Sequence, residues 1–70
     1  EGAEEHLQRA IAADPTVVLF HLDLGETYQL QGKTDQARAA FQAGLKVPDL
    51  YPTDRKFKET IVRRLEALGR

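Results

Sequence analysis

The sequence contains few residues that could act in catalysis or bind a metal, and their spacing fits neither role. His6 and His21 are the only imidazoles, and there is no cysteine. We expect the two histidines on different helices, without metal-ligand spacing, each in solvated or half-buried packing. Asp23 and Glu26 lie one helical turn apart, a common spacing for exposed acids. Because no Ser/His/Asp arrangement, glycine-rich phosphate loop or paired inward carboxylate occurs, the sequence predicts no enzyme, no metal and no cofactor.

The length and composition describe one small domain or part of one. A chain of 70 residues buries only about 60% of the surface that its unfolded form exposes. No methionine occurs, even at the first position, so we expect an excised piece of a longer protein. No run of about 18 apolar residues occurs, which predicts no membrane span. The compartment is not indicated, although a soluble, cytoplasmic protein is favoured.

The formal charge of −1 hides an asymmetry between the two halves of the chain. Residues 1–32 carry six acids against one arginine, whereas residues 33–70 carry nine basic residues against five acids. This division favours head-to-tail association or a partner surface of two signs, while the plainer interpretation is a pair of solvated faces. The basic residues expected on the last helix are Arg55, Lys56, Lys58, Arg63 and Arg64. The negative total charge and the lack of interleaved aromatic residues argue against nucleic acid as a partner.

The apolar periodicity predicts four helices and no strand. They are expected at about 3–13, 17–31, 35–46 and 53–68. The first ends before Pro15, because the residue that precedes a proline is pushed out of the helical region. Gly32 is expected to supply a left-handed cap after the second helix, and Gly69 to close the fourth. The expected N-caps are Thr16, then Thr34 or Asp35, then Thr53.

The same periodicity predicts which sides of the last two helices face inward. The inner face of the third helix consists of Ala37, Ala40, Phe41, Gly44 and Leu45. The apolar stripe of the fourth consists of Phe57, Ile61, Leu65 and Leu68, with Val62 on its flank. The linker between them is stiff because prolines stand at both of its ends. Its two large apolar residues, Leu50 and Tyr51, are expected to tuck back onto the core.

An internal repeat relates the first helix to the third. A shift of 34 residues places Ala3 on Ala37, Leu7 on Phe41, Ala10 on Gly44 and Ile11 on Leu45. This period, with two helices in each unit, resembles the tetratricopeptide repeat. The family pattern of Leu-Gly, Tyr, Ala, Phe, Ala and Pro is matched by Leu24, Gly25, Tyr28, Ala37, Phe41, Gly44 and Pro48. The resemblance covers residues 3 to about 48.

The resemblance implies an all-α fold of antiparallel helix-turn-helix repeats in a right-handed superhelix, with those seven residues as its signature core. Residues 1–70 would be a single domain fragment. Residues 1–14 would form the second helix of a truncated repeat, 15–48 one complete repeat, and 49–70 a C-terminal capping helix. The truncation is expected to leave an open apolar edge at Leu7 and Ile11.

The chain departs from the family pattern at two places. His21 stands where the family usually has Trp, so the entrance to the second helix is expected to pack differently. Lys58 and Glu59 stand where Leu and Gly would begin another unit. The fourth helix therefore resembles a terminal cap, whose polar outer face keeps the end of a stack soluble.

Members of the family line a concave groove with the first helix of each unit. Carried over to this sequence, the groove would be lined by Leu19, Leu22, Glu26, Gln29 and Leu30. Leu22 and Glu26 stand where relatives that clamp acidic peptide C-termini present Lys and Asn, so an anionic ligand is not expected. The groove suits an apolar or basic segment, helical or extended. The alternative is that Leu22 and Leu30 only pack against the fourth helix.

The resemblance therefore implies a non-catalytic scaffold that binds a peptide or helix of another protein in this groove. Self-association into a homo-oligomer is an alternative, since an open apolar edge and ends of opposite charge would join copies. A further alternative is a regulatory appendage of a larger enzyme. The sequence identifies no particular partner.

Overall fold

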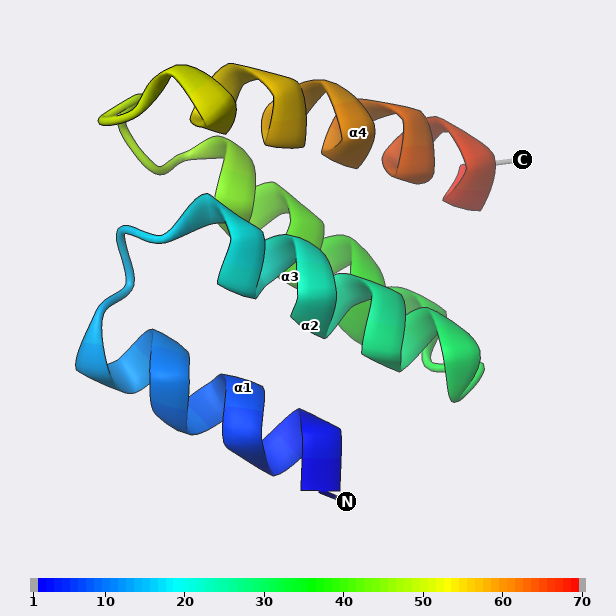
Figure 1. Cartoon of the computed structure of the whole chain (residues 1–70). Coiled ribbons are helices and arrows are strands. Elements are labelled where there is room, and N and C mark those ends of the chain that lie inside the picture. Colours follow the sequence, from blue (N-terminus) through cyan, green and yellow to red (C-terminus); the bar gives the residue numbers. More distant parts are fainter. Residues whose placement is uncertain (1, 70) are drawn as a thin grey trace.

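The computed structural model describes residues 2–69, which contain four α-helices and no strand (Figure 1). The helices are α1 (Gly2–Ala13), α2 (Val18–Leu30), α3 (Thr34–Leu45) and α4 (Pro52–Leu68). Each begins and ends within a residue or so of the expected bounds, which is the usual uncertainty of helix ends. The expected all-α fold is confirmed.

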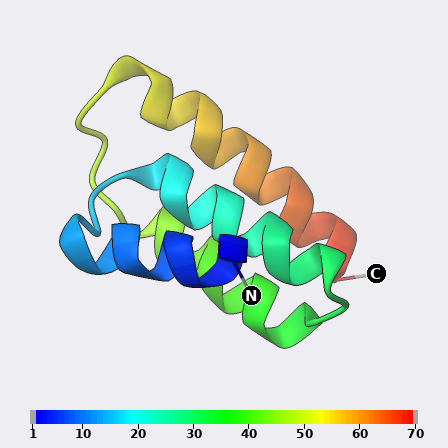
Figure 2. The same cartoon turned by 60° about the horizontal axis from the view of Figure 1, so that its bottom comes forward.

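Successive helices run in opposite directions and pack side by side (Figures 1 and 2). α2 and α3 form the most extensive contact, α1 lies against α2, and α4 lies across both α3 and α2. Consequently α2 and α4 are neighbours that run in the same direction. The molecule is a slab with principal extents of 30 × 27 × 14 Å, and the exposed residues of α2 are Leu19 and Leu30.

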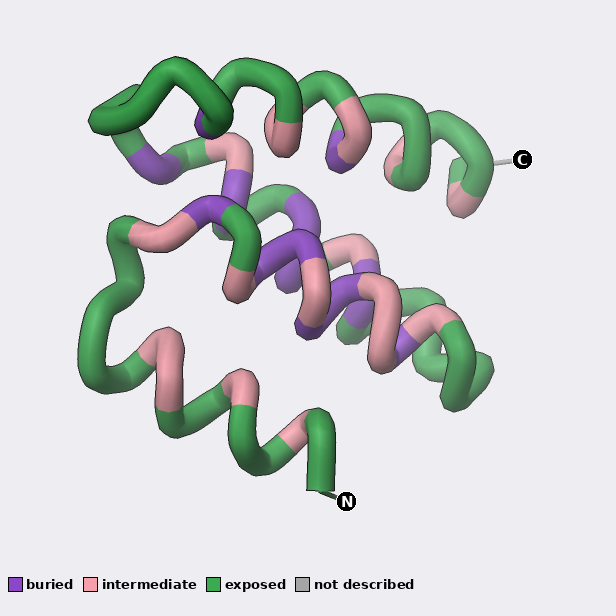
Figure 3. Tube along the Cα trace, in the orientation of Figure 1, coloured by how far each residue is buried: buried purple, intermediate pink, exposed green. Residues whose placement is uncertain are grey.

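The core lies between α2, α3 and α4, whereas α1 contributes only half-buried side chains (Figure 3). The largest fully buried side chains are Val18, Phe41 and Ile61, one from each of these three helices. The buried apolar set is Val18, Leu22, Leu24, Tyr28, Ala37, Ala40, Phe41, Val47 and Ile61. Full burial of one large apolar side chain contributes about 1.5–3 kcal/mol of stability. We therefore expect these residues to supply most of the free energy that holds α2, α3 and α4 together.

Two glycines allow the helices to approach closely. A Cβ atom at Gly25 of α2 would lie 2.3 Å from the ring of Phe41. A Cβ atom at Gly44 of α3 would lie 2.9 Å from both Ile61 Cδ1 and His21 Cβ. These separations are shorter than van der Waals contact permits, so only glycine fits without moving its neighbours. Gly44 thus marks the point where α2, α3 and α4 meet.

His21 is more buried than the sequence led us to expect. Its side chain is only 7% exposed, and its Nε2 lies 2.9 Å from the carbonyl oxygen of Pro15. Because a carbonyl oxygen can only accept, Nε2–H donates this bond. The expectation of solvated or half-buried packing is wrong for His21, since this bond satisfies its ring inside the protein. His6 lies exposed on α1, as expected.

Thr16 forms a turn with Asp14 and does not cap α2. Its backbone N–H and its hydroxyl both donate to Asp14 Oδ1, at 3.1 and 2.6 Å. The hydroxyl bond, followed by the backbone bond, stabilises the carboxylate and holds the pKa of Asp14 below its ordinary value. α2 begins after Val17 and has no side-chain cap, because valine at the N-cap position has no side-chain acceptor.

The other expected N-caps are also wrong. Thr34 and Asp35 lie inside α3, which follows Lys33 without a side-chain cap, and Thr53 lies inside α4. Asp54 takes the capping role at α4: its buried carboxylate oxygen Oδ2 accepts the N–H groups of Leu50 at 2.9 Å and Tyr51 at 3.0 Å. An acid in the third helical position that reaches back to the entering chain is the acidic half of a capping box.

The chain held by Asp54 turns outward. Leu50 is 55% exposed and Tyr51 is 64% exposed, so the expectation that they tuck back onto the core is wrong. Their backbone N–H groups point at the carboxylate, and this fixes the backbone in a direction that leaves the side chains in solvent. The buried apolar residue of this segment is Val47, and not Leu50 or Tyr51.

The turn between α2 and α3 follows the expectation. Gly32 has φ 75°, the left-handed conformation that glycine adopts without strain. The N–H of Gly32 donates to the carbonyl of Gln29 at 3.1 Å, and that of Lys33 donates to the carbonyl of Tyr28 at 2.9 Å. This pair of bonds is the Schellman motif, which satisfies the last carbonyls of α2.

α1 directs its apolar side toward the rest of the protein. Leu7 and Ile11 are half-buried and pack against the core cluster. The expectation of an open apolar edge at these two residues is wrong, because the one apolar stripe of α1 faces α2.

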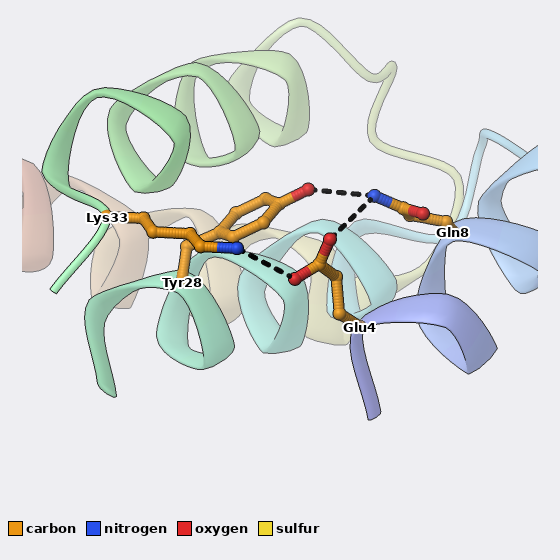
Figure 4. A network of polar contacts seen from close by, with 4 residues as sticks. All are labelled: Glu4, Gln8, Tyr28 and Lys33. Carbon is orange, nitrogen blue, oxygen red and sulfur yellow. Dashed lines mark hydrogen bonds and ion pairs between the residues drawn. The ribbon is translucent and has the colours of Figure 1, made fainter. Parts of the chain in front are cut away.

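A polar network fastens α1 to the end of α2 (Figure 4). Gln8 Nε2 donates to the hydroxyl of Tyr28 at 2.9 Å and to Glu4 Oε2 at 3.4 Å. Lys33 Nζ lies 3.5 Å from Glu4 Oε1 and 5.9 Å from the centroid of the Tyr28 ring. The buried Tyr28 therefore has its ring in the core and its hydroxyl at the boundary with solvent.

Candidate functional site

The five residues assigned to the groove divide between the surface and the core. Leu30 is 91% exposed and Leu19 is 37% exposed, whereas Glu26 and Gln29 are half-buried. Leu22 is 6% exposed and belongs to the core, so it cannot line an open groove. The alternative that Leu30 packs against α4 is also wrong, because its side chain is almost fully in solvent.

Glu26, Gln29 and Leu30 line a hollow of about 450 Å³, together with Arg64 of α4. α2 supplies one wall and α4 the other, because the two helices are neighbours that run in the same direction. Sequence reasoning missed Arg64 as a lining residue. The repeat pattern was the only signal for Arg64. In a stack of repeats, α4 takes the position of the first helix of the next unit, and a helix in that position lies beside α2.

An ion pair joins the two walls of this hollow. Arg64 Nη2 lies 2.6 Å from Glu26 Oε2, and the side chains are 45% and 33% exposed. A pair with this exposure contributes about 0–1 kcal/mol, because water screens both charges. Its larger consequence is electrostatic: the charge of Glu26 is balanced, so this carboxylate alone does not make the hollow acidic.

Two further cationic contacts hold α4 in position. Lys58 forms an ion pair with Asp49 at 2.6 Å and donates to the carbonyl oxygen of Val47. At the other end of the helix, Arg38 Nη2 of α3 lies 3.4 Å from the carbonyl oxygen of Leu68. A cation at the C-terminus of a helix also suits the helix dipole. These contacts join α4 to the linker that precedes it and to α3.

The signature residues form the scaffold beneath this surface. Leu24, Gly25, Tyr28, Ala37, Phe41 and Gly44 are buried. Pro48 is exposed and does not belong to the core, because the preceding Val47 takes the buried position at the end of α3. None of these residues presents a reactive group toward the hollow.

Within residues 2–69 no group of three or more His, Asp or Glu side chains could hold a metal ion. No helix among these residues is both long and apolar enough to cross a bilayer. The arrangement can supply an apolar contact, an amide and paired charges, which are the means of recognising another chain.

The fold and this surface define an α-helical repeat protein. A family model described as tetratricopeptide repeat matches residues 1–49, so the chain belongs to the tetratricopeptide repeat family. Tetratricopeptide repeats in general mediate protein–protein interactions and are generally non-catalytic. No curated protein and no solved structure matches the chain.

Proposed function

We propose that this chain is a non-catalytic interaction module that binds a peptide or helix of another protein along the outer side of α2. The observation that carries the proposal is the hollow between α2 and α4, lined by Glu26, Gln29, Leu30 and Arg64. Leu30 is 91% exposed there, beside a cationic and an amide group. A single exposed leucine is common on protein surfaces, so the support comes from its place in a hollow between two helices, with polar side chains along the same lining.

The proposal includes a division of the chain into repeat units. Residues 1–14 are the second helix of a truncated unit, 15–48 a complete unit, and 49–70 a capping helix. The end of the family match at residue 49 supports the last boundary. The exposed side of α4 also supports it, since it carries mainly polar residues, here Arg55, Lys56, Glu59, Arg63 and Glu66.

The experiment that tests this function is selection of binding peptides from a random library, followed by measurement with two variants. Leu30→Asp alters the proposed surface, and Leu50→Asp is its matched control on the exposed linker. Both side chains lie in solvent, so neither change should unfold the protein. We expect selected peptides to lose at least about tenfold in affinity for Leu30→Asp and to bind Leu50→Asp as they bind the parent.

A different pattern would contradict the proposal. Equal loss with both variants would mean that binding depends on general surface hydrophobicity, and loss with Leu50→Asp alone would place the site on the linker. Circular dichroism of both variants should match the parent. The variant Leu22→Asp is unsuitable for this purpose, since Leu22 belongs to the core and its change would damage the fold itself.

A further inference from the structure

We propose that the partner is a cationic amphipathic helix, a conclusion that rests on the proposed function and specifies its ligand. The residues that carry it are Leu19, Asp23, Glu26 and Leu30. Their spacing of i, i+4, i+7 and i+11 places all four on one side of α2. The outer side of α2 therefore presents an apolar residue, two acids and another apolar residue, which we call the α2 stripe.

The apolar ends of the α2 stripe set the length of the contact. Leu19 is 37% exposed and Leu30 is 91% exposed. Eleven residues of helix separate them, which is about 16 Å at a rise of about 1.5 Å per residue. A partner that covers both must therefore carry two apolar side chains about three helical turns apart.

The charges between these ends favour a cation. Glu26 is paired with Arg64 at 2.6 Å, whereas no ion pair to Asp23 is found among residues 2–69. Asp23 is half-buried, so its carboxylate reaches the surface with one negative charge that the described residues do not balance. A Lys or Arg between the two apolar residues of the partner would supply the missing charge.

The geometry of the stripe favours a helix over an extended segment. A helix laid along α2 presents side chains with the same period as the stripe, so its apolar ends meet Leu19 and Leu30 and a basic residue between them meets Asp23. An extended chain spans about 16 Å in about five residues and turns alternate side chains away from the surface.

The test compares two synthetic peptides of roughly 16 residues in an alanine-rich helical host. Both carry two leucines three turns apart. One has lysine on the two intervening turns and the other has glutamate there. Fluorescence anisotropy at low salt should show that the lysine peptide binds at least about fivefold tighter, and the ratio should approach one at about 1 M salt. The expected ratio is modest because the groups are partly exposed.

Three variants of the protein test which charges cause the preference for the lysine peptide. Asp23→Lys should reverse the preference in favour of the glutamate peptide. If that variant does not fold, Asp23→Asn should still lower the ratio. Arg64→Gln should raise the ratio, because it leaves Glu26 unbalanced. A reduction or no change with Arg64→Gln, or an unchanged ratio with the Asp23 variants, would overturn the assignment of charge to the stripe.

The remaining outcomes separate this inference from the proposed function. Equal binding of both peptides, lost with Leu30→Asp, would overturn the cationic partner and leave the binding surface in place. If neither designed peptide binds while library-selected peptides do, the cationic helix is again overturned and the binding surface is retained. Failure of designed and selected peptides together would overturn both. A central proline in the lysine peptide should abolish binding, and retained affinity would show that the partner is not helical.

Discussion

At the scale of the residue, the contact between Gly25 and Phe41 decides whether α2 and α3 can pack. A methyl group at position 25 would meet the Phe41 ring at 2.3 Å. We expect Gly25→Ala to destabilise the protein by about 1–3 kcal/mol, although alanine favours a helix, because overpacking outweighs helix propensity. The measurement is urea unfolding. Gly2→Ala is the control, since no atom lies within 4 Å of its added methyl group.

A double-mutant cycle with Phe41→Leu tests whether this contact is the cause. Leucine lacks two of the three ring atoms that the new methyl group would meet, Cε1 and Cζ, so Gly25→Ala should cost about 1 kcal/mol less in that background. Equal costs in both backgrounds would contradict the close approach. Phe41→Ala alone should cost about 3–5 kcal/mol, which approaches the whole stability of a small domain. A parent-like unfolding curve for Phe41→Ala would contradict the repeat register.

The turn of Asp14 and Thr16 predicts a pH dependence. The pKa of Asp14 is lowered in the folded protein, so its carboxylate stabilises the fold above the pKa of the unfolded chain. This stabilisation is lost as the pH falls through the lowered folded value. We expect Thr16→Ala to lower Tm near neutral pH, and the difference from the parent to narrow at about pH 2. A difference that is the same at both pH values would show that Asp14 is not involved.

At the scale of the element, α4 depends on a single acid for its start. Asp54 is buried and accepts two backbone N–H groups, from Leu50 and Tyr51. Asp54→Ala should destabilise the protein by about 0.5–2 kcal/mol, and hydrogen exchange should quicken in the first turn of α4. Glu59→Ala, at an exposed position of the same helix, is the matched control. Faster exchange throughout α1 as well would contradict a local capping role.

α1, α3 and α4 could be predicted from the sequence because each has an apolar and a polar side at helical spacing. α2 is apolar on several sides, and the spacing of Leu24, Gly25 and Tyr28 identified it instead. The N-caps could not be predicted, because the capping bond depends on how the entering chain is placed. Thr16 lies one residue before the N-cap position of α2, which Val17 occupies, and its hydroxyl donates to Asp14. Thr53 precedes Asp54 directly, yet the acid reaches the entering chain. The left-handed Gly32 could be predicted, since the conformation of a Schellman turn is set within a few residues.

The candidate site was predicted only in part, because one of its four lining residues belongs to another helix. Glu26, Gln29 and Leu30 follow from the position of α2 within the repeat. Arg64 joins the site only once α4 is placed beside α2, and Leu22 is removed from it because its side chain is buried in the core. A helical period tells which residues share a side, but it cannot tell how far a neighbouring helix extends over that side.

At the scale of the whole molecule, some of the opposite charges of the two halves form ion pairs with each other within one chain. Lys33 pairs with Glu4, and Arg64 pairs with Glu26, so each pair links the acidic half to the basic half. The apolar residues Leu7 and Ile11 also face inward. Both observations remove support from self-association.

We therefore expect light scattering to report a monomer at low and at physiological salt. Charges that are satisfied within the chain have little to gain from a second copy. A dimer that dissociates as salt is added would contradict this expectation, since it would mean that the remaining charges of α1 and α4 meet between copies. A dimer that persists at high salt would point to an apolar contact at the exposed Leu30 or Leu50.

The central claim is that a partner binds on the outer side of α2, beside α4. The most direct test is an NMR titration of the ¹⁵N-labelled chain with a library-selected peptide. The account predicts that the largest amide shift changes fall between Leu19 and Leu30 and around Arg64, with little change on the outer side of α1 or in the exposed linker. Shift changes concentrated in α1, or around Leu50 and Tyr51, would contradict it.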